Sequence, residues 1–163
     1  MNTPEFRTGT GYDIHRLEAG RSLIIGGVTV PAAVGAVGHS DADVLAHAVV
    51  DALLGAVKAG DIGRRYPDSD PRWKGADSAL FLRETSQLLR DQGWTIVNVD
   101  ASVLLQTPKL QPHIAAMEAN ISRALGIDVD RVSVKAKTNE GVDAVGEGRA
   151  VACHAVVLVV RTT

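Results

Sequence analysis

The sequence predicts an α+β domain in which helices pack on one face of a single β-sheet. Segments with strand-like and helix-like apolar spacing follow one another in the order β-β-α-α-β-α-β-β, which is not a regular alternation of strand and helix. The chain has 163 residues, enough for one sizeable core, and contains no repeat, linker or low-complexity segment. We therefore expect one domain over residues 1–163, with residues 1–7 as a flexible tail.

A strand and a hairpin are expected near the N-terminus. Residues 8–15 form the strand, and Asp13 and His15 project from the same face of it because they are two residues apart. The apolar triplets 23–25 and 28–30 flank a Gly-Gly pair, which is typical of a hairpin.

A long helix is expected over about residues 41–58, after a loop over residues 32–38. Ser40 is the expected N-cap because Asp43, three residues later, completes a capping-box pattern, and Gly60 signals the C-terminal end. The buried stripe of this helix consists of Val44, Leu45, Ala48, Val49, Ala52, Leu53, Ala56 and Val57.

Asp43, His47 and Asp51 are spaced one turn apart along one edge of this helix. The two carboxylates are expected to hold the imidazole of His47 in one tautomer and to leave its other nitrogen free. His39 lies just outside the helix start, where the partial positive charge favours anions, so both histidines could face one anionic ligand. The alternative interpretation is an ordinary solvated helix edge.

The second half begins with a loop over residues 60–71 that is rich in Gly, Pro and Asp. Ser78 then opens a helix that Gly93 ends, with Leu82, Leu88 and Leu89 as core candidates. In the strand over residues 94–105, one face is expected to carry Val97, Val99, Ala101, Val103 and Leu105.

A further helix and two strands complete the expected fold. Pro112 stands near the start of the helix, whose stripe is Ile114, Met117, Ile121 and Leu125 before Gly126. Strands are expected over residues 131–138 and 150–160, joined by a glycine-rich loop. Because the last strand is apolar on both faces, helices would cover one face and another subunit the other.

Composition excludes several functional classes. With 17 basic and 19 acidic residues the net charge is −2, which gives no basic surface for nucleic acid or an anionic membrane. No apolar run approaches the roughly 18 residues of a membrane span, and the start lacks the pattern of a signal peptide, so we expect a cytoplasmic location. The single cysteine, Cys153, excludes an internal disulfide and is expected to be a buried hydrophobic residue.

Asp13, His15 and His47 form a candidate metal site, if the strand meets the helix. One carboxylate and two imidazoles leave a tetrahedral zinc ion with an open fourth position, which is typical of a catalytic site. Such an ion would act as a Lewis acid on a phosphoryl or carbonyl oxygen. By spacing alone, a half-exposed polar strand face explains Asp13 and His15 as well.

Two loops offer further polar groups. The loop at Asp61 suits a sugar-like polyol, and the turn over residues 138–141 suits a phosphate with magnesium. Ordinary turn chemistry is the alternative for both.

Seven segments, taken in order, resemble one family. They are Gly11-Tyr12-Asp13-Ile14-His15, His39-Ser40-Asp41-x-Asp43-x-x-x-His47, Asp51-Ala52-Leu53-Leu54, Gly60-Asp61-Ile62-Gly63, Tyr66-Pro67-Asp68-Ser69-Asp70-Pro71, Lys74-Gly75-Ala76-Asp77-Ser78 and Pro108-Lys109-Leu110-x-Pro112-His113. The family is 2-C-methyl-D-erythritol 2,4-cyclodiphosphate synthase of the non-mevalonate isoprenoid pathway, and the similarity runs from about residue 8 to residue 160.

This resemblance implies a homotrimer in which sheets face each other and active sites lie between subunits. The implied substrate, a cytidine diphosphate derivative, is 4-diphosphocytidyl-2-C-methyl-D-erythritol 2-phosphate, whose 2-phosphate attacks the β-phosphorus and displaces CMP. Such an intramolecular attack requires no protein nucleophile, but it requires that two anionic groups be held together and neutralised.

The resemblance also implies roles for individual residues. Asp13, His15 and His47 would bind zinc, Glu140 would bind magnesium, and His39 and Thr138 would stabilise the transition state. The methylerythritol subsite would consist of Asp61, Ile62, Gly63, Tyr66, Pro67, Asp68, Ser69 and Asp70. The cytidine pocket of the neighbouring subunit would consist of Leu105, Gln106, Thr107, Pro108, Lys109, Leu110 and Gln111. Further substrate contacts would come from Asp13, Ile14, His15, His39, Ser40, Lys137, Thr138, Asn139 and Glu140.

The chain departs from the family pattern around residues 137–148. Lys137-Thr138-Asn139-Glu140 stands where the family commonly has two or three threonines before the glutamate, and the loop that follows is about two residues shorter than usual. We expect Lys137 to supply part of the positive charge that this loop lacks.

Two other functions remain open from the sequence. In a metal-dependent phosphohydrolase, metal-bound water would attack a phosphate ester and give a linear product. The second alternative is a non-catalytic protein that binds a nucleotide or an isoprenoid phosphate, although binding alone does not require a metal ion with an open coordination position.

Overall fold

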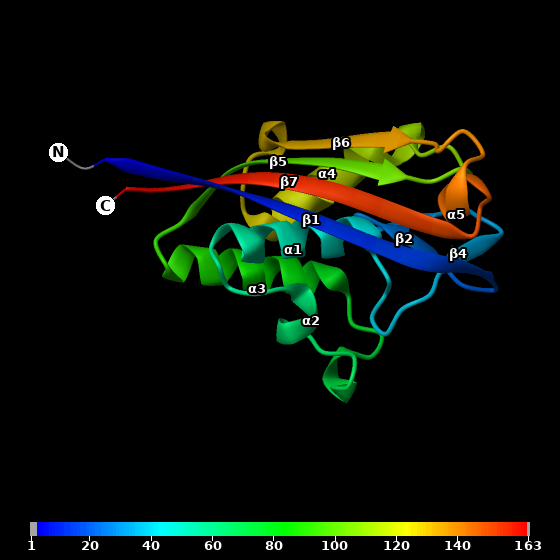
Figure 1. The fold of residues 1–163 in the computed structure, drawn as a ribbon, viewed down its shortest axis with the longest axis horizontal. Helices are drawn as coiled ribbons and strands as arrows, with labels where there is room; N and C mark the ends of the chain where they lie inside the picture. Colours follow the sequence, from blue (N-terminus) through cyan, green and yellow to red (C-terminus); the bar gives the residue numbers. More distant parts are fainter. Residues whose placement is uncertain (1–2, 163) are drawn as a thin grey trace.

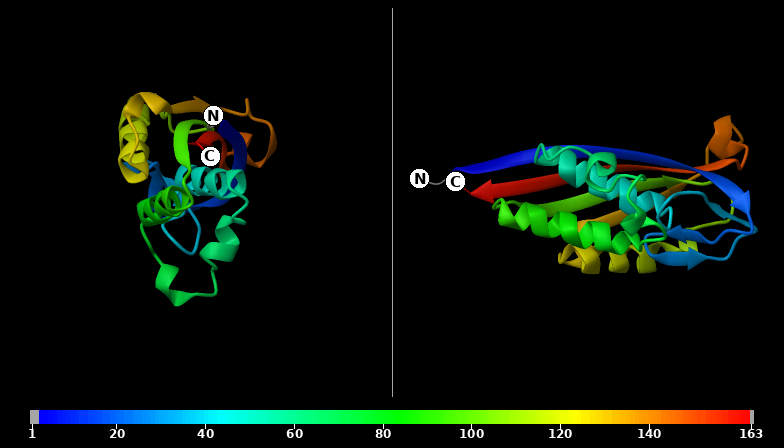
Figure 2. Two further views of the ribbon diagram at one scale, coloured as in Figure 1. Left: turned by 90° about the vertical axis from the view of Figure 1, so that its left-hand side faces the viewer. Right: turned by 90° about the horizontal axis from the view of Figure 1, so that it is seen from below.

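The computed structural model describes residues 3–162 and shows a five-stranded sheet with its long helices on one face (Figure 1, Figure 2). The strands in spatial order are β4 (Val34–Ala36), β1 (Pro4–Ala19), β7 (Ala150–Thr162), β5 (Thr95–Leu104) and β6 (Val132–Lys137). The β5–β6 pair is parallel, and the other pairs in this sheet are antiparallel. A separate hairpin pairs β2 (Leu23–Ile25) with β3 (Val28–Val30). The predicted α+β architecture is confirmed, with this second small sheet added.

Three long helices cover one face of the five-stranded sheet (Figure 2). They are α1 (Val44–Ala56), α3 (Ser78–Asp91) and α4 (Ile114–Leu125). The short elements are α2 (Ile62–Arg65), α5 (Asp143–Gly146) and the 3-10 turns Pro71–Trp73, Gln111–His113 and Val129–Arg131. Within residues 3–162, no helix combines the length and the apolar character that a membrane span requires.

Two glycines of β1 allow α1 to pack directly on the sheet. A Cβ atom added to Gly9 would lie 1.9 Å from the carbonyl oxygen of Ala52, and one added to Gly11 would lie 1.9 Å from that of Ala48. Since any side chain here would push α1 away, these glycines set the distance between the strand and the helix.

The expected start of the first helix is wrong. Asp43, not Ser40, is the N-cap: its carboxylate accepts the backbone N–H groups of Leu45 and Ala46. It also accepts N–H groups from the hairpin, as described below, and these contacts distant in sequence decide the start of the helix.

β1 is longer than expected because it pairs with β7 along its whole length, as far as Pro4 opposite Thr162. The expected flexible tail is therefore wrong for residues 4–7, which belong to the strand, while residues 1–2 lie outside the described part. The expected loop over residues 32–38 contains β4, which pairs with the end of β1.

The expected alternation in β5 is wrong at its start. The pairing with β7 shifts between Ile96 and Asn98, and this bulge buries Ile96 instead of Val97. From Val99 onward the alternation is confirmed. The predictions for α4 and for a buried Cys153 are also confirmed, and burial raises the pKa of that thiol.

The face of the sheet opposite the long helices exposes large apolar side chains. Phe6, Tyr12 and Ile14 of β1 are 59%, 51% and 45% exposed, and Val156 of β7 is 47% exposed. Neighbouring large apolar side chains exposed on one face are typical of an interaction surface.

Candidate active site

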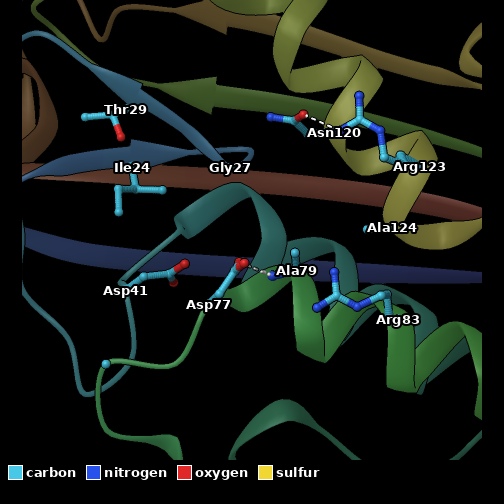
Figure 3. Close-up of a pocket in the computed structure, with 11 residues that line it drawn as sticks. Ile24, Gly27, Thr29, Asp41, Asp77, Ala79, Arg83, Asn120, Arg123 and Ala124 are labelled. Atoms are coloured by element: carbon cyan, nitrogen blue, oxygen red, sulfur yellow. Dashed lines mark hydrogen bonds between the residues drawn. The ribbon is translucent and has the colours of Figure 1, made fainter.

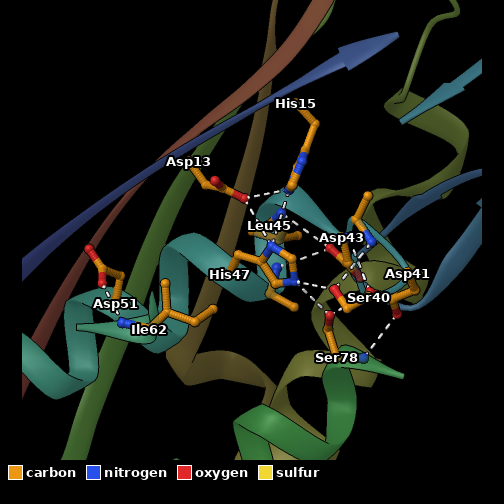
Figure 4. Close-up of polar contacts among 12 residues, drawn as sticks. Asp13, His15, Ser40, Asp41, Asp43, Leu45, His47, Asp51, Ile62 and Ser78 are labelled. Carbon is orange, nitrogen blue, oxygen red and sulfur yellow. Dashed lines mark hydrogen bonds and ion pairs between the residues drawn. The ribbon is translucent and has the colours of Figure 1, made fainter. Parts of the chain in front are cut away.

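Asp13 and His15 of β1 meet His47 of α1 at the first turn of that helix (Figure 4). Asp13 Oδ2 lies 2.8 Å from His15 Nε2 and 3.0 Å from His47 Nδ1, and the two nitrogens are 3.1 Å apart. The strand therefore meets the helix, which is the condition on which the candidate metal site depended. One carboxylate oxygen and two imidazole nitrogens in so small a triangle could hold one metal ion.

The outer contacts of the histidines test whether this triangle suits a cation. His15 Nδ1 lies 2.9 Å from the carbonyl oxygen of Val37, which can only accept, so in the neutral ring Nδ1 carries the hydrogen and Nε2 presents its lone pair to the triangle. His47 directs Nδ1 into the triangle and Nε2 toward the hydroxyls of Ser78 at 2.8 Å and Ser40 at 3.1 Å. The donor set fits a metal ion, because an anionic oxygen and an imidazole lone pair converge on one point.

The carboxylates expected to orient His47 do not contact it. Asp43 is buried and accepts N–H groups from Gly26 at 2.9 Å and from Gly27 at 2.7 Å, so it holds the β2–β3 hairpin against α1. Asp51 accepts the N–H of Ile62 at 3.0 Å and anchors the start of α2. Helical spacing identified the edge correctly, but both carboxylates bind backbone groups instead.

Asp13 and His15 stabilise each other's charged form. Burial disfavours the ionised carboxylate of Asp13, but the close polar contacts with His15 and His47 outweigh it and hold its pKa well below the usual range. Burial also disfavours the charged imidazole of His15, but the hydrogen bond and the charge of Asp13 outweigh it and raise its pKa. In the absence of a metal ion, a proton can therefore occupy the space between these groups.

The triangle opens into a pocket of about 350 Å³. Its described lining residues are Asp13, His15, Val37, Gly38, His39, Ser40, His47, Ile62, Gly63, Tyr66, Asp68, Trp73 and Phe81. The Nε2 of His39 lies 3.1 Å from the carbonyl oxygen of Asp70, to which it donates. The long loop after α1 therefore forms one wall and is fastened to the histidine segment.

Several predicted site residues do not line this pocket. Ile14 lies on the opposite face of the sheet, because neighbouring residues of a strand alternate. Asp61 is exposed and caps α2 through the N–H of Arg64, and Asp70 pairs with Arg72. Pro67 and Ser69 belong to the same loop but are absent from the described lining.

Tyr66 was predicted to line this pocket, but Trp73 and Phe81, which complete an aromatic wall with it, were not predicted as site residues. Phe81 stacks on Tyr66 at a centroid distance of 4.3 Å, and Trp73 contacts both rings edge-on. Its residues come from the loop after α1 and from α3, and aromatic residues in such places resemble ordinary core residues in a sequence.

A second pocket, of about 240 Å³, lies at the end of β6. Its described lining residues are Leu105, Gln106, Pro108, Lys109, Leu110, Gln111, Ala136, Lys137 and Thr138. The predicted cytidine segment thus meets the predicted phosphate segment, with Thr107, Asn139 and Glu140 beside this lining. The Thr138 hydroxyl donates to Glu140 Oε1 at 3.2 Å; Glu140 is exposed and Thr138 is half-buried.

The two pockets are far apart within one chain. Strand pairing places Ile14, Ala152, Leu104 and Lys137 in one row across β1, β7, β5 and β6. Three strand spacings separate the ends of this row, which is about 14 Å. Lys137 also leaves the sheet on the face of Ile14, opposite to Asp13.

Known proteins similar to this chain share one description. A model of the YgbB family matches residues 6–160. Proteins named 2-C-methyl-D-erythritol 2,4-cyclodiphosphate synthase are 55% identical in Bordetella petrii, over 100% of both chains, and 57% identical in Desulfosudis oleivorans, over 95% of this chain and 92% of that protein.

Solved structures agree with this description. The bifunctional IspDF from Campylobacter jejuni has a TM-score of 0.94 and 38% identity over 98% of this chain, which spans only 43% of that protein. A CDP-bound form of 2C-methyl-D-erythritol-2,4-cyclodiphosphate synthase has a TM-score of 0.86 and 43% identity over 94% of this chain and 99% of that one. The chain therefore belongs to the YgbB family, the family of the 2-C-methyl-D-erythritol 2,4-cyclodiphosphate synthases.

Proposed function

We propose that this chain converts 4-diphosphocytidyl-2-C-methyl-D-erythritol 2-phosphate to 2-C-methyl-D-erythritol 2,4-cyclodiphosphate and CMP, as a phosphorus–oxygen lyase of isoprenoid precursor synthesis. An oxygen of the 2-phosphate bonds to the β-phosphorus, the bond from that phosphorus to the bridging oxygen breaks, and CMP leaves with this oxygen. Family membership supports the reaction. The observation that carries it is the triangle of Asp13, His15 and His47 at the pocket, since it provides a metal site where two phosphates must be neutralised.

Zinc suits this triangle best, because it takes mixed nitrogen and oxygen ligands and keeps a fourth position open. Bound by Asp13, His15 and His47, it would supply Lewis-acid stabilisation of a phosphoryl oxygen. The protein itself contributes ligands that are already oriented: Val37 fixes His15, and serine hydroxyls fix His47. No side chain has to act as a nucleophile, since the attacking phosphate belongs to the substrate.

His39 is proposed to stabilise the transition state from the wall of the pocket. Its donation to the carbonyl oxygen of Asp70 fixes the ring and leaves its Nδ1 side for the substrate. Beside it, the backbone of Ile62 and Gly63 and the side chains of Tyr66 and Asp68 line a space for the polyol. We assign the methylerythritol portion to residues 61–63 and 66–70.

The second pocket is proposed to bind cytidine and the leaving phosphate. CDP in the structure of a relative supports a cytidine nucleotide as ligand. Residues 105–111 would hold the nucleoside, while Lys137, Thr138, Asn139 and Glu140 would contact the phosphates, with magnesium at Glu140. The row that joins the two pockets is about 14 Å long, and Lys137 leaves the sheet on the face opposite to Asp13. A substrate bound at both places within one chain would therefore have to pass around the sheet.

A homotrimer with sites between neighbouring subunits resolves this separation. The exposed apolar face of β1 and β7 supports association, because Phe6, Tyr12, Ile14 and Val156 would leave water there. We propose that residues 1–163 form a single domain of this trimer and that the protein acts in the cytoplasm.

Phosphorus NMR with the cytidylylated methylerythritol 2-phosphate, magnesium and zinc tests the reaction. A cyclic diphosphate formed together with CMP is the expected result, and His47→Ala should abolish it. A linear product carrying a solvent oxygen would instead identify a phosphohydrolase. Unchanged substrate that remains bound by metal-loaded protein would identify a binding protein.

Subunit mixing tests the shared site. His47→Ala and Thr138→Ala each disable one proposed half, so each alone should be nearly inactive. When the two variants are unfolded and refolded together, mixed trimers contain some sites with both halves intact, and activity should return. His47→Ala mixed with Asp13→Ala is the matched control, because both changes fall in the same half. Equal inactivity of both mixtures would refute a site between subunits.

A further inference from the structure

We propose that Ser78 and Asp41 are positioning residues that fix His47 in the tautomer whose Nδ1 is free for a metal ion. This inference rests on the metal role proposed for His47, but it concerns two residues that stand outside the triangle. Both belong to segments that resemble the family, and neither binds the metal ion or the substrate in the reaction proposed above.

The direction of each hydrogen bond follows from what the groups can donate. Ser78, the first residue of α3, is fully buried, and its hydroxyl lies 2.5 Å from Asp41 Oδ1 and 2.8 Å from His47 Nε2 (Figure 4). An ionised carboxylate only accepts, so the single hydroxyl hydrogen of Ser78 goes to Asp41. Ser78 Oγ then has only lone pairs left for His47. Nε2 must therefore carry a ring hydrogen. Asp13 Oδ2 lies 3.0 Å from Nδ1 and is itself only an acceptor, so Nδ1 presents its lone pair when a metal ion lies between the two and binds both.

Asp41 is itself held in place. Its Oδ2 accepts the backbone N–H of Ser78 at 2.9 Å, and its Oδ1 accepts that of Asp43 at 3.2 Å. Its own N–H donates to the carbonyl oxygen of Ala76 at 3.1 Å. The carboxylate therefore cannot rotate away without losing several hydrogen bonds. This fixes the direction of donation, from His47 Nε2 to Ser78 Oγ and from the Ser78 hydroxyl to Asp41.

Ser40 cannot provide the same control. Its hydroxyl lies 3.1 Å from His47 Nε2, and its oxygen accepts a long contact from the N–H of Ala42 at 3.4 Å. No described acceptor takes its hydrogen in the way that Asp41 takes that of Ser78, so Ser40 can either donate to the ring or accept from it. If Ser78 were removed, Ser40 could donate to Nε2, and the hydrogen would move to Nδ1.

Asp41 and Ser78 act through His47 and not on the substrate. Neither is among the described residues that line the 350 Å³ pocket. Asp41 instead lines a separate cavity of about 630 Å³ between the β2–β3 hairpin, α3 and α4, where Figure 3 shows it near Asp77 and below Ile24. Substitutions at these positions therefore leave the substrate contacts in place.

The tautomer can be read directly in metal-free protein. Long-range ¹H–¹⁵N NMR of the histidine rings, at a pH where free imidazole is neutral, should show hydrogen on Nε2 of His47 in the wild type and in Ser40→Ala. Ser78→Ala should move it toward Nδ1 and weaken zinc binding by about 10- to 100-fold in a chelator competition. Ser86→Ala is the matched control: Ser86 is also buried on α3, but its hydroxyl donates to the carbonyl oxygen of Leu125, so zinc affinity should not change.

Asp41→Asn provides a second variant should Ser78→Ala fail to fold. Its amide can donate to Ser78 Oγ, which frees the hydroxyl hydrogen to point at Nε2, so the same shift is expected. Folded variants in which His47 keeps hydrogen on Nε2 and zinc affinity equals that of the wild type would overturn the proposal. Wild-type protein that shows the expected tautomer but binds no zinc would refute the metal site instead, so the two failures are distinguishable.

Discussion

Replacing Gly11 by alanine should disrupt the proposed metal site, although Gly11 has no side chain that could bind a metal ion. The added Cβ would lie 1.9 Å from the carbonyl oxygen of Ala48 and 2.8 Å from the backbone nitrogen of Ala52. To bring the shorter contact to 3.0 Å, β1 and α1 must separate by about 1.1 Å, since both contacts are with backbone. His47 precedes Ala48 and would move with it, away from Asp13 and His15. Ligand distances in metal sites tolerate only about 0.2 Å.

Two measurements follow from this displacement. Overpacking costs about 1–3 kcal/mol, so the urea midpoint of metal-free Gly11→Ala should fall by a corresponding amount. Zinc affinity should fall by more than the roughly 100-fold that loss of an outer ligand contact causes. Gly55→Ala is the matched control, because Gly55 lies in α1 with open space around its Cβ position and alanine should stabilise the helix by about 0.5–1 kcal/mol. A Gly11→Ala protein with wild-type stability and zinc affinity would refute this reasoning.

Three further predictions concern other parts of the site. Asp43→Ala should destabilise the protein by about 1.5–5 kcal/mol in urea unfolding, since it removes a helix cap and leaves the buried N–H of Gly26 unpaired. A loss below about 1 kcal/mol would contradict this role. Metal-free protein should lose stability as the pH rises through the raised pKa of His15, because its charged form is favoured by folding and that contribution is complete only below the unfolded value of about 6.5. Urea unfolding at several pH values checks this, and no loss on the alkaline side would argue against it. Lys137→Ala should raise KM or lower kcat in the cyclisation assay if Lys137 pairs with substrate phosphates; unchanged steady-state kinetics would exclude that role.

Local patterns predicted those elements that local interactions determine. In α4 Met117, Ile121 and Leu125 of the expected stripe are buried and Ile114 is half-buried. Gly126 ends the helix at φ 72°, as the sequence indicates. The N-cap of α1 could not be predicted in the same way. Ser40 fits the local pattern, but Asp43 is the N-cap because the N–H groups of Gly26 and Gly27 in the hairpin also donate to its carboxylate. The bulge at Ile96 likewise follows from pairing with β7, which no short window of sequence contains.

The candidate metal site was predictable in its parts but not in its assembly. Period-two spacing puts Asp13 and His15 on one face, and helical spacing selects His47, yet their contact spans 34 residues of sequence and depends on how closely α1 packs on β1. The resemblance to a family supplied that step. Ser78 could not be found by pattern, because a serine in the first turn of a helix is read as a capping residue and its partners His47 and Asp41 come from another part of the chain.

The same packing that brings the metal triangle together separates it from the second half of the proposed site. Asp13 faces α1 because that face of β1 carries glycines, and the alternation of the strand then turns Tyr12 and Ile14 to the uncovered face. Lys137 shares a row and a face with Ile14, so the end of β6 that is proposed to bind phosphate is presented on the side where association is proposed. Burial of this apolar face and completion of the site would then be one event, and a subunit that cannot associate would keep its metal triangle but lack catalysis.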